Sequence, residues 1–150
     1  MSTKELTKMN TSGKWESGLK TSISIRDFAP VIVDEPANLG GTDEGPNPLE
    51  YVLAGLSSCT SVMIALIAKE QNFTFEAVSF ENEGSIDLEG LMGVEGVSTY
   101  FQTVKYTVYI ETSETDEKLS ALKAAVEKRC PVLNILINAG VNVEANWIKQ

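Results

Sequence analysis

The chain contains no histidine, which removes imidazole chemistry altogether. Ser/His/Asp triads, Cys/His nucleophile pairs and HExxH zinc sites all need that ring and are therefore excluded. Cysteine is scarce as well: Cys59 and Cys130 are the 2 copies. They do not form a CxxC pair, which excludes a thioredoxin-like or zinc-ribbon site. Chemistry at neutral pH is thus left to the thiols, the carboxylates and the arginines, Arg26 and Arg129.

Positive charge is also in short supply, with 12 basic against 21 acidic side chains and a net charge of −9. An acidic protein repels phosphate backbones and anionic lipid, so we expect no nucleic-acid partner and no membrane partner. Residues 1–10 are polar, are expected to form a flexible N-terminus and lead into no apolar signal-peptide core. We therefore expect a cytoplasmic protein.

No hydrophobic run is convincing as a membrane span. The longest uncharged run, residues 51–68, contains glycine, serine and threonine and has no basic bias at its ends, which favours a helix in a soluble core. The 150 residues, 43% hydrophobic and 22% charged, are typical of a globular protein. We expect one domain over residues 1–150.

The first part of the chain predicts strands followed by a loop and a long helix. Residues 7–33 alternate between apolar and polar side chains around a turn at Ser17 and Gly18, which predicts a hairpin and a further strand. Residues 34–47, rich in proline, glycine and carboxylates, predict a loop. A helix over residues 48–71 should follow, because Asn47 can cap it, Pro48 suits its first position and Glu50 has capping-box spacing. Its nearly uniform apolar surface predicts a central position.

The second part alternates strands and helices. Strands are predicted over residues 75–86, 100–110 and 141–148, a loop over residues 84–96, and helices over residues 115–129 and 131–138, divided at Pro131. The order of the elements predicts an α+β domain in which antiparallel strands pack on two helices.

Each candidate site residue has a structural and a functional interpretation. Cys59, in the middle of the long helix, is either a small buried hydrophobic residue or a nucleophile. Cys130 precedes Pro131, and the backbone N–H groups of the short helix, with Lys128 and Arg129 nearby, would favour a thiolate there, although an inert cap is equally consistent. The capping box explains Glu50 without any role in catalysis.

Two segments resemble a known family. DEPANLGGTDEGPNPLEYVLAGLSSC, residues 34–59, and EKRCPVLNIL, residues 127–136, are similar to motifs of the OsmC/Ohr superfamily of osmotically inducible and organic-hydroperoxide-resistance proteins. The specific features are an Asn-Pro step before a helix of small residues that contains a cysteine, coupled to a downstream Cys-Pro-Val. The order of helices and strands agrees from about Trp15 onward.

The resemblance implies an OsmC-like fold: an intertwined homodimer whose two long central helices lie between antiparallel sheets. It also implies reduction of an organic hydroperoxide, with Cys59 as the peroxidatic thiolate and Cys130 as the resolving thiol. A sulfenic acid at Cys59 would give a disulfide with Cys130, which a dithiol reductant would reopen, and no metal or cofactor is needed.

The sequence departs from the peroxidase pattern at two positions. The family glutamate that follows Asn-Pro is replaced by Leu49, with Glu50 one position later, and no arginine stands at the position that matches the family. Arg26 is therefore the candidate electrostatic partner of the thiolate, and Glu50 would orient it. Two alternatives stay open: a protein that binds a small hydrophobic molecule in an apolar pocket at the dimer interface, lined by Cys59, and another thiol reaction such as persulfide or thioester handling.

Overall fold

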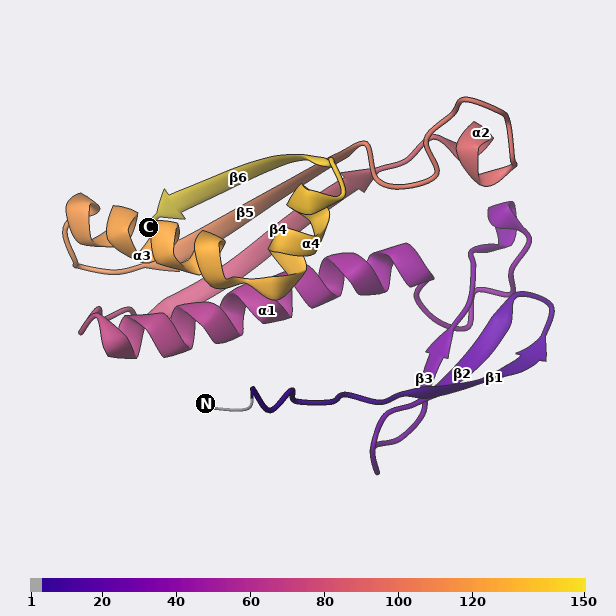
Figure 1. Cartoon of the computed structure of the whole chain (residues 1–150), viewed down its shortest axis with the longest axis horizontal. Helices are drawn as coiled ribbons and strands as arrows, with labels where there is room; N and C mark the ends of the chain where they lie inside the picture. The colour runs from indigo at the N-terminus through magenta and orange to yellow at the C-terminus, as the bar shows by residue number, and fades with distance from the viewer. Residues whose placement is uncertain (1–3) are drawn as a thin grey trace. The chain divides into compact units, whose positions relative to one another are not determined.

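A computed structural model describes residues 4–150, and these divide into two compact units (Figure 1). The first unit ends at Val52 and the second is Leu53–Gln150, so that the boundary falls within helix α1, Pro48–Glu70. Of the N-terminal segment expected to be flexible, residues 1–3 lie outside the described residues, and residues 4–11 form neither helix nor strand.

The first unit contains an antiparallel sheet in the order β1-β2-β3. Its strands are β1 (Ser12–Ser17), β2 (Lys20–Ser24) and β3 (Val31–Val33). The predicted hairpin joins β1 to β2, and Gly18 takes the left-handed backbone (φ +54°) that its tight turn requires. The predicted loop before α1 contains one short 3₁₀ helix, η1 (Ala37–Leu39).

The loop is organised around Asp34, which is 1% exposed. Its carboxylate accepts hydrogen bonds from the Thr42 hydroxyl at 2.6 Å and from the backbone N–H groups of Glu35 and Glu44 at 2.8 and 3.2 Å. The Thr42 hydroxyl bond, reinforced by these backbone bonds, outweighs the effect of burial and lowers the pKa of Asp34 to about 2. A charged side chain thus serves as the core of this loop.

Helix α1 begins at the predicted capping box. The Asn47 N–H donates to the Glu50 carboxylate at 2.8 Å, and the Glu50 N–H donates to Asn47 Oδ1 at the same 2.8 Å. The helix buries one stripe rather than its whole surface: Leu56, Thr60, Ile64, Ile67 and Ala68. This stripe agrees with the predicted central position of the helix, whereas its other positions are half-buried or exposed in the single chain.

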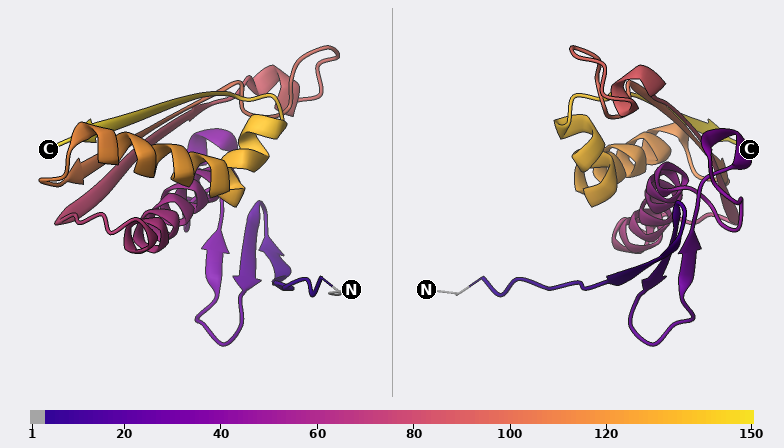
Figure 2. Two further views of the ribbon diagram at one scale, coloured as in Figure 1. Left: turned by 60° about the vertical axis from the view of Figure 1, so that its left-hand side comes forward. Right: turned by 90° about the vertical axis from the view of Figure 1, so that its right-hand side faces the viewer.

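The second unit contains a sheet in the order β4-β5-β6. Its elements are β4 (Ala77–Ser85), α2 (Leu88–Leu91), β5 (Thr103–Glu111), α3 (Asp116–Arg129), α4 (Pro131–Asn138) and β6 (Asn142–Lys149). Helices α3 and α4 lie on one face of this sheet, where β5 buries Val104, Tyr106, Val108 and Ile110 (Figures 1 and 2).

Two expectations about the second unit need correction. Strand β6 pairs with β5 in parallel, not antiparallel, because α3 and α4 carry the chain back to the start of β5. The segment 84–96, expected to be a loop, contains the end of β4 and the short helix α2, whose N-cap Asp87 accepts a hydrogen bond from the Glu89 N–H. The α+β class itself is confirmed.

Candidate active site

The second unit brings the two cysteines together although they lie 71 positions apart in the sequence. Their sulfur atoms are 3.3 Å apart, and both thiols are free. Cys59 comes from the middle of α1, and Cys130 occupies the junction between α3 and α4. Because a disulfide bond is about 2.05 Å long, a short local movement would be enough to join the two sulfurs.

The two thiols differ in their access to solvent. Cys59 is half-buried, whereas Cys130 is 0% exposed and lies behind it in the core of the second unit. A reagent entering from solvent therefore meets Cys59 first. This difference in access favours Cys59 as the first of the two thiols to react.

The surroundings of Cys130 favour a protonated thiol. Burial raises its pKa above the usual value, the neighbouring Cys59 raises it further, and the Leu133 N–H at the start of α4 offsets only part of this. The helix start does lower the pKa through this N–H, as expected from the sequence, but burial outweighs it, which favours the alternative of an inert cap. Arg129 is moreover engaged elsewhere: its guanidinium binds both oxygens of the Glu70 carboxylate, at 2.6 and 3.1 Å.

Two buried side chains with hydroxyl groups, Thr60 and Tyr106, lie near Cys130. Thr60, next to Cys59 on α1, is buried, and its hydroxyl donates to the Leu56 carbonyl at 2.8 Å. Tyr106 on β5 is also buried, and burial, followed by the charge of Glu127, raises its pKa well above the usual range. Its hydroxyl donates to the Glu127 carboxylate at 3.3 Å. Both hydroxyls are therefore engaged with acceptors other than the two sulfurs.

The other two predicted site residues have local explanations in the first unit. Arg26 lies in the loop between β2 and β3 with a left-handed backbone (φ +49°), and its guanidinium carbon is 4.7 Å from the centre of the Phe28 ring. Glu50 is bound to Asn47 at the start of α1. The structure thus brings Cys59 and Cys130 next to each other, while the roles predicted for Arg26 and Glu50 stay predictions.

Two asparagines of the second unit, Asn82 and Asn134, make buried or half-buried hydrogen bonds that were not foreseen. The Asn82 amide, on β4, donates to the Leu53 carbonyl at 2.9 Å and to Ser57 Oγ at 2.5 Å, and its own Oδ1 is buried without a partner. Asn134 donates to carbonyls at the end of α3. In the sequence, Asn82 could have been noticed as a polar residue among the apolar, inward-facing positions of a predicted strand. Asn134 could have been noticed as a polar residue four positions after a cysteine, one helical turn away.

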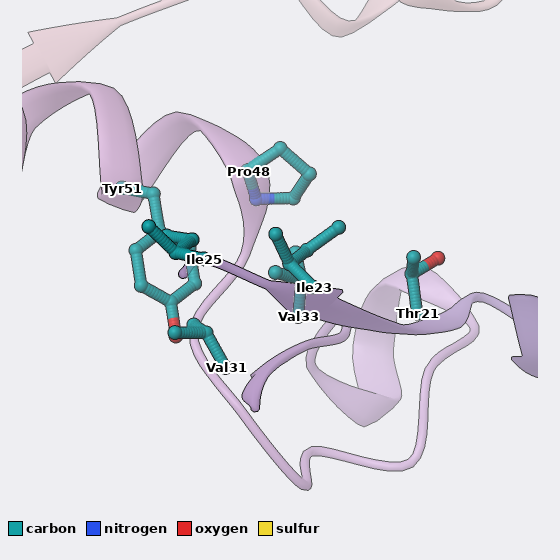
Figure 3. Close-up of a pocket in the computed structure, with 7 residues that line it drawn as sticks. All are labelled: Thr21, Ile23, Ile25, Val31, Val33, Pro48 and Tyr51. Atoms are coloured by element: carbon teal, nitrogen blue, oxygen red, sulfur yellow. The ribbon is translucent and has the colours of Figure 1, made fainter. Parts of the chain in front are cut away.

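The first unit contains an apolar cavity of about 470 Å³. Its lining residues are Thr21, Ile23, Ile25, Val31, Val33, Pro48 and Tyr51. Figure 3 shows side chains of β2 and β3 facing Pro48 and the Tyr51 ring. The Tyr51 hydroxyl is held by the Ile32 carbonyl at 3.0 Å. Cys59 is not among the lining residues, so this cavity is not the thiol-lined pocket expected from the sequence.

Among residues 4–150 no group of three or more His, Cys, Asp and Glu side chains is placed to hold a metal ion. The expectation that the chemistry needs neither metal nor cofactor stays a prediction. What the structure does show at this site is the pair of neighbouring sulfurs and the buried hydroxyl groups of Thr60 and Tyr106.

An α+β fold that brings together one free thiol from a long helix and one from the junction of two later helices defines a class of two-cysteine proteins. The sequence model of one family in that class, described as OsmC-like protein, matches residues 41–146, which include both cysteines. The chain belongs to the OsmC-like protein family. The expectation of a single domain over residues 1–150 stays a prediction. No curated protein matches the sequence at a significant level.

Solved structures share the fold at low sequence identity. An OsmC-like protein from Mycoplasma pneumoniae is 19% identical with a TM-score of 0.80, covering 95% of this chain and 98% of its own. An organic hydroperoxide resistance protein OsmC from Legionella pneumophila is 23% identical, with a TM-score of 0.75 and coverage of 97% and 99%. One from Elizabethkingia anophelis, with thiocyanate bound, is 19% identical, with a TM-score of 0.78 and coverage of 99% and 100%.

The family resolves the interpretation of α1. Among the described residues, α1 is the one helix long and apolar enough to cross a membrane. Proteins of the OsmC/Ohr family are soluble, and core helices of soluble proteins have the same length and composition. Helix α1 is therefore a core helix, as its buried stripe indicates.

Proposed function

We propose that the protein is a thiol-dependent peroxidase that reduces organic hydroperoxides. The observation that carries the proposal is the 3.3 Å separation between a half-buried Cys59 sulfur and a fully buried Cys130 sulfur. This arrangement supplies a nucleophile that a peroxide can reach and a second thiol that only the product of the first step meets. Two of the solved structures with the same fold are organic hydroperoxide resistance proteins, which supports the same substrate class.

The reaction proceeds in three balanced steps. The Cys59 thiolate attacks the terminal peroxide oxygen, the O–O bond breaks, and Cys59 sulfenic acid and an alkoxide form; the alkoxide takes up a proton and leaves as the alcohol. The Cys130 sulfur then attacks the Cys59 sulfur, and the sulfenic oxygen leaves as water with the Cys130 proton. A dithiol reductant reduces the Cys59–Cys130 disulfide by exchange and is itself oxidised to a disulfide.

The second step also needs a proton. Because burial raises its pKa, the Cys130 thiol carries its proton at neutral pH and gives it up as it attacks. That proton is the one that the departing hydroxide needs. We further propose that Arg26 and Glu50 assist Cys59, as its electrostatic partner and as the residue that orients that partner, and that the protein is a cytoplasmic homodimer.

Peroxide turnover by single-cysteine variants tests the proposal. Reduced protein is mixed with cumene hydroperoxide and dithiothreitol, and loss of peroxide is followed. We expect steady turnover by the wild type and none by Cys59→Ser; without dithiothreitol, Cys130→Ser should consume one equivalent of peroxide and accumulate Cys59 sulfenic acid. Peroxide turnover by the wild type no faster than that by Cys59→Ser would contradict the proposal.

The apolar cavity in the first unit favours a second candidate function, binding of a small hydrophobic molecule. Its volume of about 470 Å³ is within the range of ligand pockets, and its walls are aliphatic apart from Thr21 and the Tyr51 ring. Native mass spectrometry of freshly purified protein would then show added mass. Ile23→Trp, which fills the cavity, should remove that mass, whereas Cys59→Ala should leave it intact.

A further inference from the structure

The helical backbone is interrupted between α3 and α4 at Cys130, the residue that carries the second thiol. In a continuous helix the N–H of residue 131 would donate to the Glu127 carbonyl, but Pro131 has no N–H. The break would leave the last carbonyls of α3 without partners, next to a fully buried sulfur. Some other donor must therefore satisfy them.

The Asn134 side chain supplies that donor from the first turn of α4. Its amide nitrogen lies 3.0 Å from the Glu127 carbonyl oxygen, 2.8 Å from that of Cys130 and 3.4 Å from that of Lys128. The Asn134 backbone N–H also donates to the Cys130 carbonyl at 3.1 Å. One residue thus ties both sides of the break to each other, with the Cys130 backbone held at its centre.

We propose that Asn134 is a positioning residue that fixes the Cys130 sulfur within reach of Cys59. Because the hydrogen bonds of the Asn134 side chain set the angle between α3 and α4 at Cys130, they determine the direction in which the Cys130 sulfur projects toward α1. The 3.3 Å sulfur–sulfur distance is the result. The inference rests on the proposed function only in naming the disulfide as a catalytic intermediate; the geometry of disulfide closure is independent of the oxidant.

Disulfide closure can be measured without any peroxide. The equilibrium between the Cys59–Cys130 disulfide and oxidised or reduced dithiothreitol is titrated for the wild type, Asn134→Ala, Asn134→Asp and Asn134→Ser. Asn138→Ala and Asn138→Asp, at the exposed end of α4, are the matched controls. We expect a disulfide at least about tenfold easier to reduce in Asn134→Ala and Asn134→Asp. Asn134→Ser should lie between these and the wild type, since serine keeps one donor that reaches the Cys130 carbonyl. The Asn138 variants should match the wild type.

A single-turnover experiment separates positioning from a general structural role. After one equivalent of cumene hydroperoxide, trapping with dimedone should show sulfenic acid forming at the wild-type rate in Asn134→Ala and Asn134→Ser but persisting roughly tenfold longer. Equal closure in the wild type and Asn134→Ala would overturn the inference, as would a defect confined to the aspartate variant, which would indicate charge instead. If the wild type does not react with peroxide, the proposed function fails, and the dithiothreitol equilibrium still decides the role of Asn134.

Discussion

At the scale of single residues, the two thiols should react with an alkylating agent at very different rates. Cys130 is 0% exposed and its pKa is raised by burial, whereas Cys59 is half-buried. With iodoacetamide at neutral pH, we expect Cys59 to be modified at least about tenfold faster than Cys130. Peptide mass spectrometry over time measures both rates. In 6 M guanidinium the two rates should converge, and preferential modification of Cys130 in the folded protein would contradict the assignment of Cys59 as the accessible thiol.

Asp34 should make the stability depend on pH in the acid range. The pKa of its carboxyl falls from 3.8 to about 2 on folding, because of the Thr42 hydroxyl and the backbone N–H donors. The unfolded chain therefore takes up the proton first as the pH falls. The stabilisation is complete above about pH 4 and is lost as the pH falls from about 4 to 2.

The measurement is urea denaturation at several pH values for the wild type, Asp34→Asn and Asp43→Asn, an exposed carboxyl of the same loop. Asp34→Asn should be less stable at pH 6, and its disadvantage should shrink toward pH 2. Asp43→Asn should follow the wild type throughout. A disadvantage of Asp34→Asn that does not change with pH would show that its charge is not what the loop uses.

Residue types and spacing singled out Cys59 and Cys130, but they did not establish that the two sulfurs meet, because no local pattern encodes contacts between distant segments. Asp34 shows the same limit. In the sequence it is one of several carboxylates in a polar loop, and its burial follows from the folded path that brings Thr42 and Glu44 back to it. Local capping, in contrast, could be predicted: the Asn47–Glu50 pair lies within one helical turn.

At the scale of elements, the start of α1 should respond to its capping box. Asn47→Ala removes the acceptor for the Glu50 N–H and should cost about 1 kcal/mol of unfolding free energy. Glu50→Gln keeps an oxygen for the Asn47 N–H and should stay within about 0.5 kcal/mol of the wild type. Urea denaturation measures both. Loss of peroxide turnover in a fully stable Glu50→Gln would support the orienting role of Glu50 beyond capping, whereas equal losses of stability would contradict the capping assignment.

Helix limits could be predicted well because their signals are local. Pro131 and Gly140 set the two ends of α4, and Thr115 is the N-cap of α3, its hydroxyl accepting the Lys118 N–H. The direction of β6 could not be assigned from its alternating pattern, which is the same for parallel and antiparallel pairing. The crossover through α3 and α4 decides it.

At the scale of the whole molecule, two apolar surfaces lack cover in a single chain. In the first unit the cavity face carries Ile23 and Val33, and in the second unit Val62 and Leu66 on α1 are 54% and 49% exposed. Exposed apolar faces of this kind are typical of interfaces. Because OsmC/Ohr proteins are generally dimeric, we expect a second copy of this chain to cover both surfaces.

Light scattering after size exclusion should therefore give about twice the chain mass of 16.3 kDa. Ile23→Asp and Val62→Asp each place a charge on one of the apolar surfaces and should shift the mass toward that of one chain. Ser24→Asp, on the opposite face of the same strand as Ile23, adds the same charge outside these surfaces and should leave the dimer intact. Circular dichroism checks that each variant is folded. A wild type that stays at the mass of one chain would mean that these faces serve another partner, and the apolar cavity would then be accessible to a small ligand in solution.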